Sequence, residues 1–246
     1  MIIGMDRRAE CDVWWASPSL ARPEHLALLD QPEIGRHDRL RRPEDRDRFV
    51  VGAALARLVL ARRLGVAPAS VPLDRTCRSC GEPHGKPRVM TDNGLELSVS
   101  HSGDRVAVAV TSDHPIGVDV ERIDADVNLA GLIDQVLARS EAHDLAADGS
   151  EHQRAGFFRY WSRKEAVVKA TGEGLRVPLR DLTVSAPTEP PELGGWRDRP
   201  DLPARLRLVD LSPGPGYAAS VAALDATTLN VVERDASELL AGVSRT

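Results

Sequence analysis

Hydrophobic and polar residues alternate in two neighbouring stretches near the middle of the chain. Apolar side chains occupy every second position of residues 95–99 and again of residues 106–110, with a turn at residues 102–104 between them. Alternation on both sides of a short turn predicts a β-hairpin with one buried face. A further short strand is expected at residues 116–121, where apolar and smaller or acidic residues alternate again.

Apolar residues recur at helical spacing on both sides of this hairpin. The spacing predicts helices over residues 45–64 and 151–171, each followed by a glycine that can end it. A weaker helical region is expected over residues 128–147, and residues 66–94 are rich in turn-forming proline and glycine. Strand patterns recur at residues 181–185, 204–211 and 217–224, with a loop expected over 186–203.

The order of these elements predicts the fold class. Hairpins are mixed with helices, which favours an α+β fold over a doubly wound parallel sheet. A long helix that leads into strands occurs once in each half of the chain, although no exact sequence repeat is found. The element order therefore suggests a duplicated architecture.

Composition and charge exclude several classes of protein. Of the 246 residues 42% are hydrophobic, which supports a globular interior, but no apolar run is long enough to cross a bilayer. Residues 1–8 lack the pattern of a secretory signal, so we expect a cytoplasmic protein without membrane association. The net charge of −5 argues against nucleic acid as a partner, and three cysteines do not make a disulfide scaffold. Dinucleotide and Walker A motifs are absent from the sequence.

Lysine is rare in this chain. Of 32 basic residues only three are lysines, namely Lys86, Lys164 and Lys169. A surface lysine is readily replaced by arginine, so the remaining lysines indicate positions that need a compact, titratable ammonium group. Two of them lie five residues apart in one predicted helix, which makes that helix a candidate for the functional site.

Two acidic residues share one face of the strand predicted at 116–121. Asp119 and Glu121 are two positions apart, so their side chains project on the same side, about 6.5–7 Å apart along the chain. Such a pair suits a hard divalent cation, which takes one or two carboxylates and fills its coordination with water and phosphate. The alternative is an ordinary strand with a polar outer face, and for this pair taken alone that is the favoured interpretation.

The second candidate element is the helix around residue 161. Trp161, Glu165 and Lys169 are spaced at i, i+4 and i+8 and therefore lie on one face. A surface Glu–Lys pair, worth about 0.2–0.5 kcal/mol, is the alternative. Because Phe157 and Phe158 flank this face, the helix is expected to pack against neighbours, where Glu165 and Lys169 are able to complete a metal site and contact a phosphate.

Two shorter segments carry further candidates. His101 is in phase with the apolar positions of its strand, so a core histidine is the favoured interpretation. The alternative is a phosphate-binding group beside a turn, together with the serines of residues 98–102. The Gly85–Lys86–Pro87 loop allows close approach of a ligand to the backbone, and alone it is merely a turn. Cys77, Cys80 and His84 resemble half of a zinc site, but a reduced turn is the favoured interpretation.

In chain order, these segments resemble the signature of the 4′-phosphopantetheinyl transferases. Residues 116–121 and 161–170 are similar to that family's paired motif, and residues 85–87 and 98–102 match its additional motifs. Four motifs in the right order are far more specific than any one of them. The length of the chain resembles the two-half, Sfp-type branch, in contrast to half-length synthases that form trimers. This resemblance implies two similar α+β halves, residues 1–112 and 113–246, packed as a pseudo-dimer.

The resemblance implies an activity and its partners. Such enzymes move 4′-phosphopantetheine from coenzyme A to a serine of an apo acyl or peptidyl carrier protein and release adenosine 3′,5′-bisphosphate. Mg²⁺ is the implied metal, with Mn²⁺ as an alternative. The sequence is similar to enzymes of polyketide and nonribosomal peptide synthesis. Two halves in one chain favour a monomer. Because carrier domains are typically acidic, we expect an apolar, arginine-edged docking surface near residues 128–165.

The resemblance also implies roles for individual residues. The implied Mg²⁺ ligands are Asp119, Glu121 and Glu165, with Glu165 and Lys169 as the catalytic residues. Glu165 would take the proton of the carrier serine, and Lys169 would contact the departing phosphate, as an acid or by charge alone. The metal and the catalytic helix would belong to residues 113–246.

The first half would bind the nucleotide end of coenzyme A. His101 and Arg48 match the contacts to the 3′-phosphate, with Ser100 beside them. The implied coenzyme A-binding residues are Arg48, Gly85, Lys86, Pro87, Ser100, His101 and Lys169. Where family members often place lysines for the nucleotide, this chain has arginines such as Arg36 and Arg39, which are not included in the predicted site.

Two rival interpretations remain at this point. Another Mg²⁺-dependent phosphate enzyme, such as a pyrophosphohydrolase, would need more glutamates on its helix than residues 157–170 provide, since Glu165 is the only one there. A non-catalytic module built on Cys77, Cys80 and His84 would retain one tightly bound zinc per chain, which metal analysis distinguishes from reversible Mg²⁺.

Overall fold

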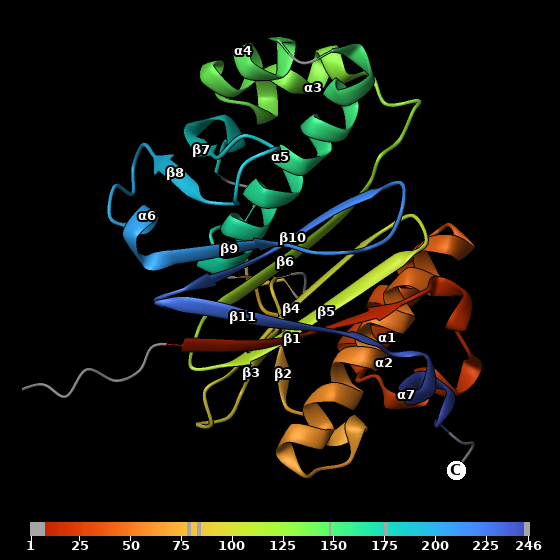
Figure 1. Cartoon of the computed structure of the whole chain (residues 1–246). Helices are drawn as coiled ribbons and strands as arrows, with labels where there is room; N and C mark the ends of the chain where they lie inside the picture. The colour runs from red at the N-terminus through yellow and green to blue at the C-terminus, as the bar shows by residue number, and fades with distance from the viewer. Residues whose placement is uncertain (1–7, 78–79, 83–84, 148, 175–176, 244–246) are drawn as a thin grey trace, which may run out of the picture.

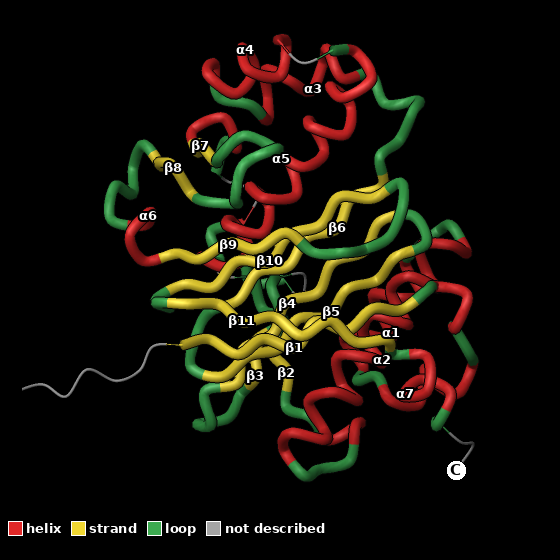
Figure 2. Tube along the Cα trace, in the orientation of Figure 1, coloured by secondary structure: helices red, strands yellow, loops and turns green. Residues whose placement is uncertain are grey.

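The computed structural model describes residues 8–77, 80–82, 85–147, 149–174 and 177–243. Two sheets and two long helices form the framework (Figures 1 and 2). The first sheet has the order β11-β1-β5-β4, and the second has the order β6-β10-β9. The strands of the first sheet are β1 (Arg8–Ala16), β4 (Leu95–Ser102), β5 (Arg105–Ser112) and β11 (Thr228–Asp235), and those of the second are β6 (Ile116–Arg122), β9 (Leu206–Asp210) and β10 (Tyr217–Leu224).

One 22-residue helix covers the outer face of each sheet. Helix α2 (Pro43–Leu64) packs on β4 and β5, and helix α5 (Ser150–Thr171) packs on β6 and β10. Both helices end in the same way, because Gly65 and Gly172 take the left-handed conformation, with φ of 68° and 73°. The inner faces of the sheets pack against each other through small residues such as Ala107, Ala109 and Ala219. The layers are therefore helix, sheet, sheet, helix (Figure 1).

Shorter elements surround this framework. The remaining helices are α1 (Gln31–Arg39), α3 (Leu129–Val136), α4 (Arg139–Ala147), α6 (Leu202–Arg205) and α7 (Ser237–Ala241), with 3₁₀ helices at Pro18–Leu20, Pro23–Leu28, Pro68–Ser70 and Leu179–Asp181. Two small sheets pair β2 (Leu73–Asp74) with β3 (Arg88–Val89) and β7 (Leu182–Val184) with β8 (Leu193–Trp196). Among the described residues, no helix is both long and apolar enough to span a bilayer.

The α+β fold class is confirmed, and so are the hairpin and both long helices. Two local expectations were wrong. The helical region predicted at 128–147 is divided into α3 and α4, because Leu137 takes an extended conformation. The loop predicted at 186–203 contains strand β8 and the start of α6.

The end of the chain returns to the first sheet. Strand β11 pairs in parallel with β1, with Arg8 opposite Thr228, and α7 buries Leu239 and Leu240 in the core beneath α2. Residues 228–241 therefore pack with the N-terminal elements. The division of the chain into halves between residues 112 and 113 remains a prediction. The two sheets meet along strand β4, which precedes this point in the chain, and strand β6, which follows it.

Candidate active site

A cleft of about 1030 Å³ opens where β4 and β6 meet, between helices α2 and α5. The predicted site residues converge on it from four separate segments of the chain. Those that line the cleft are Gly85, Lys86, Pro87, Ser100, His101, Asp119, Glu121, Glu165 and Lys169. Arg48 alone among the predicted residues does not line it. It pairs with Asp45 at 2.5 Å and donates to the carbonyl oxygen of Gly103 at 3.2 Å.

Gly117 allows helix α5 to approach strand β6 closely. A Cβ atom at this position would lie 2.1 Å from the carbonyl oxygen of Ala166 and 2.3 Å from the amide nitrogen of Ala170. Only glycine leaves room for this contact between the two backbones. The close approach brings Glu165 and Lys169 of α5 beside Asp119 of β6, two residues after the glycine.

Gly117→Ala should therefore lower the stability of the protein. The methyl group must displace α5, and overpacking of this kind costs about 1–3 kcal/mol. The free energy of unfolding in urea measures the loss. Gly131→Ala is the control, because a Cβ there meets nothing within 4 Å and lies in helix α3. That variant should be neutral or more stable by about 0.5–1 kcal/mol; equal stability of both variants would contradict the role of Gly117.

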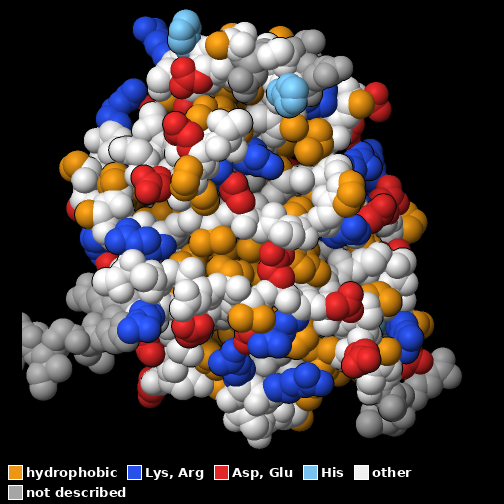
Figure 3. Space-filling view, in the orientation of Figure 1, with side chains coloured by type: hydrophobic (Ala, Val, Ile, Leu, Met, Phe, Trp, Pro, Cys, Tyr) orange, Lys and Arg blue, Asp and Glu red, His pale blue; other side chains and the backbone are white. Residues whose placement is uncertain are grey.

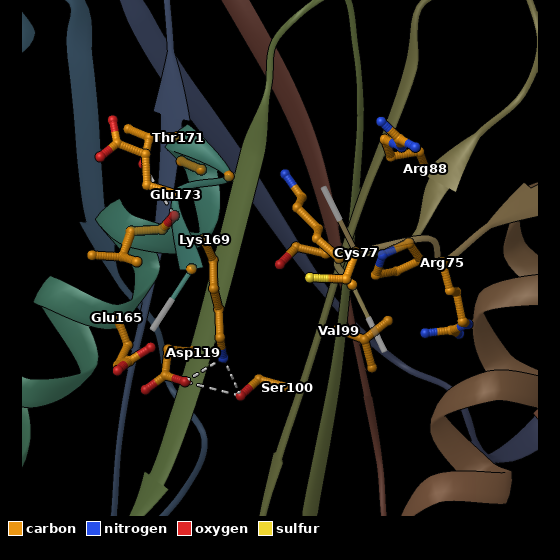
Figure 4. Close-up of a pocket in the computed structure, with 18 of the residues that line it drawn as sticks. Arg75, Cys77, Arg88, Val99, Ser100, Asp119, Glu165, Lys169, Thr171 and Glu173 are labelled. Carbon is orange, nitrogen blue, oxygen red and sulfur yellow. Dashed lines mark hydrogen bonds and ion pairs between the residues drawn. The ribbon is translucent and has the colours of Figure 1, made fainter. Parts of the chain in front are cut away.

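Asp119 is the centre of the polar network in the cleft. Its side chain is buried, and its Oδ1 atom accepts hydrogen bonds from Lys169 Nζ at 2.6 Å and from Ser100 Oγ at 3.0 Å (Figure 4). Lys169 Nζ also donates to Ser100 Oγ at 2.9 Å. Among the described residues, the second oxygen of Asp119, Oδ2, is buried without a hydrogen-bond partner. A buried carboxylate oxygen of this kind is costly unless a ligand satisfies it.

Three carboxylates influence one another in this cleft. Burial and the negative charge of Asp119 raise the pKa of Glu121 to about 7, although Ser102 and Lys169 partly oppose the shift. The pKa of Glu165 is also raised, first by burial and then by Asp119, with Lys169 acting against it. Figure 4 shows Glu165 next to Asp119, with Lys169 reaching down to both Asp119 and Ser100. The carboxylates repel one another, and a bound cation would relieve that repulsion.

The donor set fits a hard divalent cation. In the described part of the chain, no three His, Cys, Asp or Glu side chains form a ready-made metal cluster. Mg²⁺ does not need one, since it is usually held by one or two carboxylates together with water and substrate phosphate. Asp119 and Glu121 offer such oxygens, and the unpartnered Oδ2 of Asp119 is the atom that would gain most.

His101 lies at the end of β4 and is exposed in the cleft, so it is not a core residue. Its ring remains accessible, but the walls of the cleft remove part of its hydration. This desolvation lowers the pKa of His101, and the positive charges of Lys169 and Arg48 lower it further. The cationic surroundings that disfavour a charged imidazole favour a bound anion.

Three arginines outside the predicted site also line the cleft. They are Arg36, Arg75 and Arg88, and Figure 4 shows Arg75 and Arg88 across the cleft from Asp119 and Lys169. The Arg36 guanidinium lies over the ring of Phe49, 5.2 Å from its centre. Burial, followed by the charges of Arg75 and Arg39, lowers the pKa of Arg36. Arg36 was noted from the family resemblance but left out of the predicted site, whereas no local signal separates Arg75 and Arg88 from the many other arginines in the sequence.

Residues 85–87, in the segment between β2 and β3, line the cleft beside these arginines. Gly85 is required there, because a Cβ would lie 2.9 Å from the carbonyl oxygen of Thr76. Lys86 Nζ donates to the carbonyl oxygen of Ile116 at 2.7 Å, so this lysine connects the loop to strand β6. Cys77 and Cys80 also line the cleft. The zinc hypothesis involves His84, which lies outside the described residues.

Lys164 has a structural position, in contrast to Lys169. Its ammonium is fully buried and donates to Glu141 and to the carbonyl oxygens of Val136, Leu179 and Leu182. Burial lowers the pKa of Lys164, and the charge of Glu141 opposes that shift. The two lysines of this helix therefore have different positions, with Lys169 in the cleft and Lys164 in the protein interior.

Comparison with known proteins identifies the family. Over 188 residues the chain is 34% identical to the 4′-phosphopantetheinyl transferase HetI of Nostoc sp., with 73% of this chain and 76% of HetI covered. This chain belongs to the 4′-phosphopantetheinyl transferase superfamily. Residues 115–222 match the family model of the 4′-phosphopantetheinyl transferase superfamily. The expected family and the transferase class are therefore confirmed.

Two further matches cover less of the chain. The 4′-phosphopantetheinyl transferase Sfp of Bacillus subtilis is 30% identical over 141 residues, which are 57% of this chain and 59% of Sfp. Among solved structures, the holo-[acyl-carrier-protein] synthase of Thermotoga maritima aligns with a TM-score of 0.38 and 19% identity. That alignment covers 46% of this chain and 63% of the synthase.

Proposed function

We propose that this transferase moves 4′-phosphopantetheine from coenzyme A to a serine of an apo acyl or peptidyl carrier protein, with Mg²⁺ or Mn²⁺ as the metal. The observation that supports it most is the convergence of Asp119, Glu121, Glu165 and Lys169 on one cleft with a basic opposite wall. The cleft is large enough for a nucleotide-sized ligand. Arg36, Arg75, Arg88 and His101 would hold the phosphates of the nucleotide end, in addition to the loop at residues 85–87.

The reaction needs a base, an orienting site and stabilisation of the departing phosphate. The carrier serine oxygen forms a bond to the phosphorus that bears pantetheine, and the bond to the bridging oxygen of adenosine 3′,5′-bisphosphate breaks. A metal held by Asp119 and Glu121 would neutralise charge on the pyrophosphate. Burial and the charge of Asp119 raise the pKa of Glu165, so its carboxylate would be a stronger base toward the serine proton than an exposed glutamate.

Lys169 would stabilise the leaving phosphate. Its ammonium is held by Asp119 and Ser100, so it is oriented before the substrate binds. Lys169→Arg keeps the charge but replaces the compact group by a flat guanidinium that does not release its proton. We expect kcat to fall about tenfold or more, whereas the KM for coenzyme A should change little. Turnover near that of the natural protein would reduce Lys169 to a simple positive charge.

The direct test is mass spectrometry of apo carrier proteins. Several apo acyl and peptidyl carrier domains are incubated with this chain, coenzyme A and Mg²⁺, and each active partner should gain one phosphopantetheine on one serine. Omission of the metal, or replacement of the acceptor serine by alanine, should prevent the gain. No mass increase on any carrier, with coenzyme A intact, would contradict the proposed activity.

The carrier protein would dock near residues 128–165. Helix α3 presents the half-buried side chains of Leu129, Leu132 and Ile133 in this region. On the face shown in Figure 3, basic side chains are interspersed with acidic ones. The service of polyketide or nonribosomal peptide synthases, the cytoplasmic location and the monomeric state remain predictions from the sequence.

A further inference from the structure

The two sheets meet along a seam made of serine hydroxyl groups. Strands β4 and β6 lie side by side, yet they belong to different sheets. Every second residue of β4 along the seam is a serine, and each Oγ accepts a backbone N–H of β6. Ser98 accepts from Val118 at 3.0 Å, Ser100 from Val120 at 3.4 Å and Ser102 from Arg122 at 3.1 Å. The offset is twenty residues in each case, so the register of the seam is constant.

Two of these hydroxyls also reach a carboxylate. Ser100 Oγ donates to Asp119 Oδ1 at 3.0 Å, and Ser102 Oγ donates to Glu121 Oε2 at 3.1 Å. Asp119 comes directly before Val120, and Glu121 comes directly before Arg122, so each serine contacts two successive residues of β6. The equivalent position for Ser98 is Gly117, which has no side chain. The same seam therefore contains two serines that hold a carboxylate and one that does not.

The hydrogen-bond pattern of Ser100 determines the direction of its own proton. A hydroxyl has one donor and two acceptor sites. Both acceptor sites of Ser100 are used, by the N–H of Val120 and by Lys169 Nζ, so its single proton is directed to Asp119. One oxygen of Asp119 is thereby fixed toward the seam, and the other, Oδ2, is left without a partner among the described residues. Ser102 likewise donates its proton to one oxygen of Glu121, and it accepts the N–H of Arg122.

We propose that Ser100 and Ser102 are positioning residues, which orient Asp119 and Glu121 so that one oxygen of each is available to a divalent cation. The proposal rests on the proposed function. It assigns the Ser100 hydroxyl to the orientation of Asp119, instead of the direct contact with coenzyme A that the sequence implied. Partners that orient a metal ligand typically change metal affinity or activity about 10- to 100-fold when they are removed. Ser98 accepts a backbone N–H of β6 in the same way, but it has no carboxylate to orient.

The test compares Ser100→Ala and Ser102→Ala with the matched control Ser98→Ala in the full chain. Binding of Mn²⁺ alone is measured by electron paramagnetic resonance, unfolding by urea, and transfer by Mg²⁺ titration. We expect the first two variants to weaken Mn²⁺ binding and to raise the half-saturating Mg²⁺ concentration about tenfold or more. Ser98→Ala should lose a similar amount of stability but change both metal values less than twofold. Ser100→Thr and Ser102→Thr, which keep the hydroxyl, should restore most of the Mn²⁺ affinity.

The outcomes separate this proposal from the proposed function. Equal metal binding in all three alanine variants, or an equal loss in all three, would show that the serines act only through stability and would overturn the proposal. Absence of Mn²⁺ binding by the natural protein would overturn it as well. If Ser100→Ala does not fold, the comparison of Ser102→Ala with Ser98→Ala decides. Failure of the natural protein to modify any carrier contradicts the transferase proposal, whereas the Mn²⁺ titrations still decide the positioning role.

Discussion

Glu165→Gln should reduce transfer to an apo carrier protein by about 100- to 10,000-fold, the usual contribution of a general base. The amide is close in shape to the carboxylate, but it does not take a proton from the attacking serine. It also removes one of the three negative charges that converge in the cleft. Steady-state transfer to a carrier identified by mass spectrometry measures the effect, at several Mg²⁺ concentrations.

The variant should remain folded, because the change relieves repulsion. Burial, and then the charge of Asp119, disfavour the charged form of Glu165 and raise its pKa, so the neutral amide should cost no stability. Glu173→Gln is a matched control, since this carboxylate lines the same cleft and pairs with Arg199 at 2.7 Å. It should keep most of the activity. Unchanged Mg²⁺ dependence and turnover in Glu165→Gln would overturn both roles assigned to Glu165.

The pH profile provides a second signature of the same site. In the natural protein, transfer should decrease as the pH falls through the raised pKa values of Glu121, about 7, and Glu165. Below them the carboxyl groups are protonated and neither accept a proton nor attract a cation. In Glu165→Gln, the residual transfer should still decrease at low pH, but only through the protonation of Glu121.

Lys164→Met should destabilise the protein by about 3–5 kcal/mol, the usual cost of removing one partner of a buried ion pair. Glu141 would be left buried without its ion-pair partner, and the carbonyl oxygens of Val136, Leu179 and Leu182 would lose their donor. Urea denaturation with a two-state analysis gives the change in the free energy of unfolding.

Two further variants make this experiment decisive. Addition of Glu141→Gln to Lys164→Met should recover part of the stability, because the uncompensated charge is removed. Arg159→Met changes an exposed basic residue on the same helix and should stay within about 0.5 kcal/mol of the natural protein. A Lys164→Met protein as stable as the Arg159→Met control would show that the buried pair contributes nothing.

The local elements were predictable because they depend on short-range patterns. Alternation predicted the hairpin of β4 and β5, and helical spacing predicted α2 and α5 to within two residues at each end. Strand β11 was missed, since its pairing with β1 joins residues at opposite ends of the chain. Such long-range pairing leaves no mark in a local window of sequence.

The composition of the site was predicted better than its internal contacts. Motif order brought Asp119, Glu165 and Lys169 into one site, and the structure places them in one cleft. The sequence did not predict that Lys169 would be bound to Asp119. Nor did it separate Arg75 from the other arginines, because long-range folding alone brings that residue to the cleft.

The sequence by itself determined the fold class, the two long helices and the family, because periodicity and motif order are properties of the chain alone. The tertiary structure decided what each charged group does. Lys164 and Lys169 are five residues apart, so they lie about 140° apart around the helix axis. One therefore faces the interior and the other faces the cleft. Which of these faces is buried depends on the packing of α5 against β6, and only the folded chain establishes that contact.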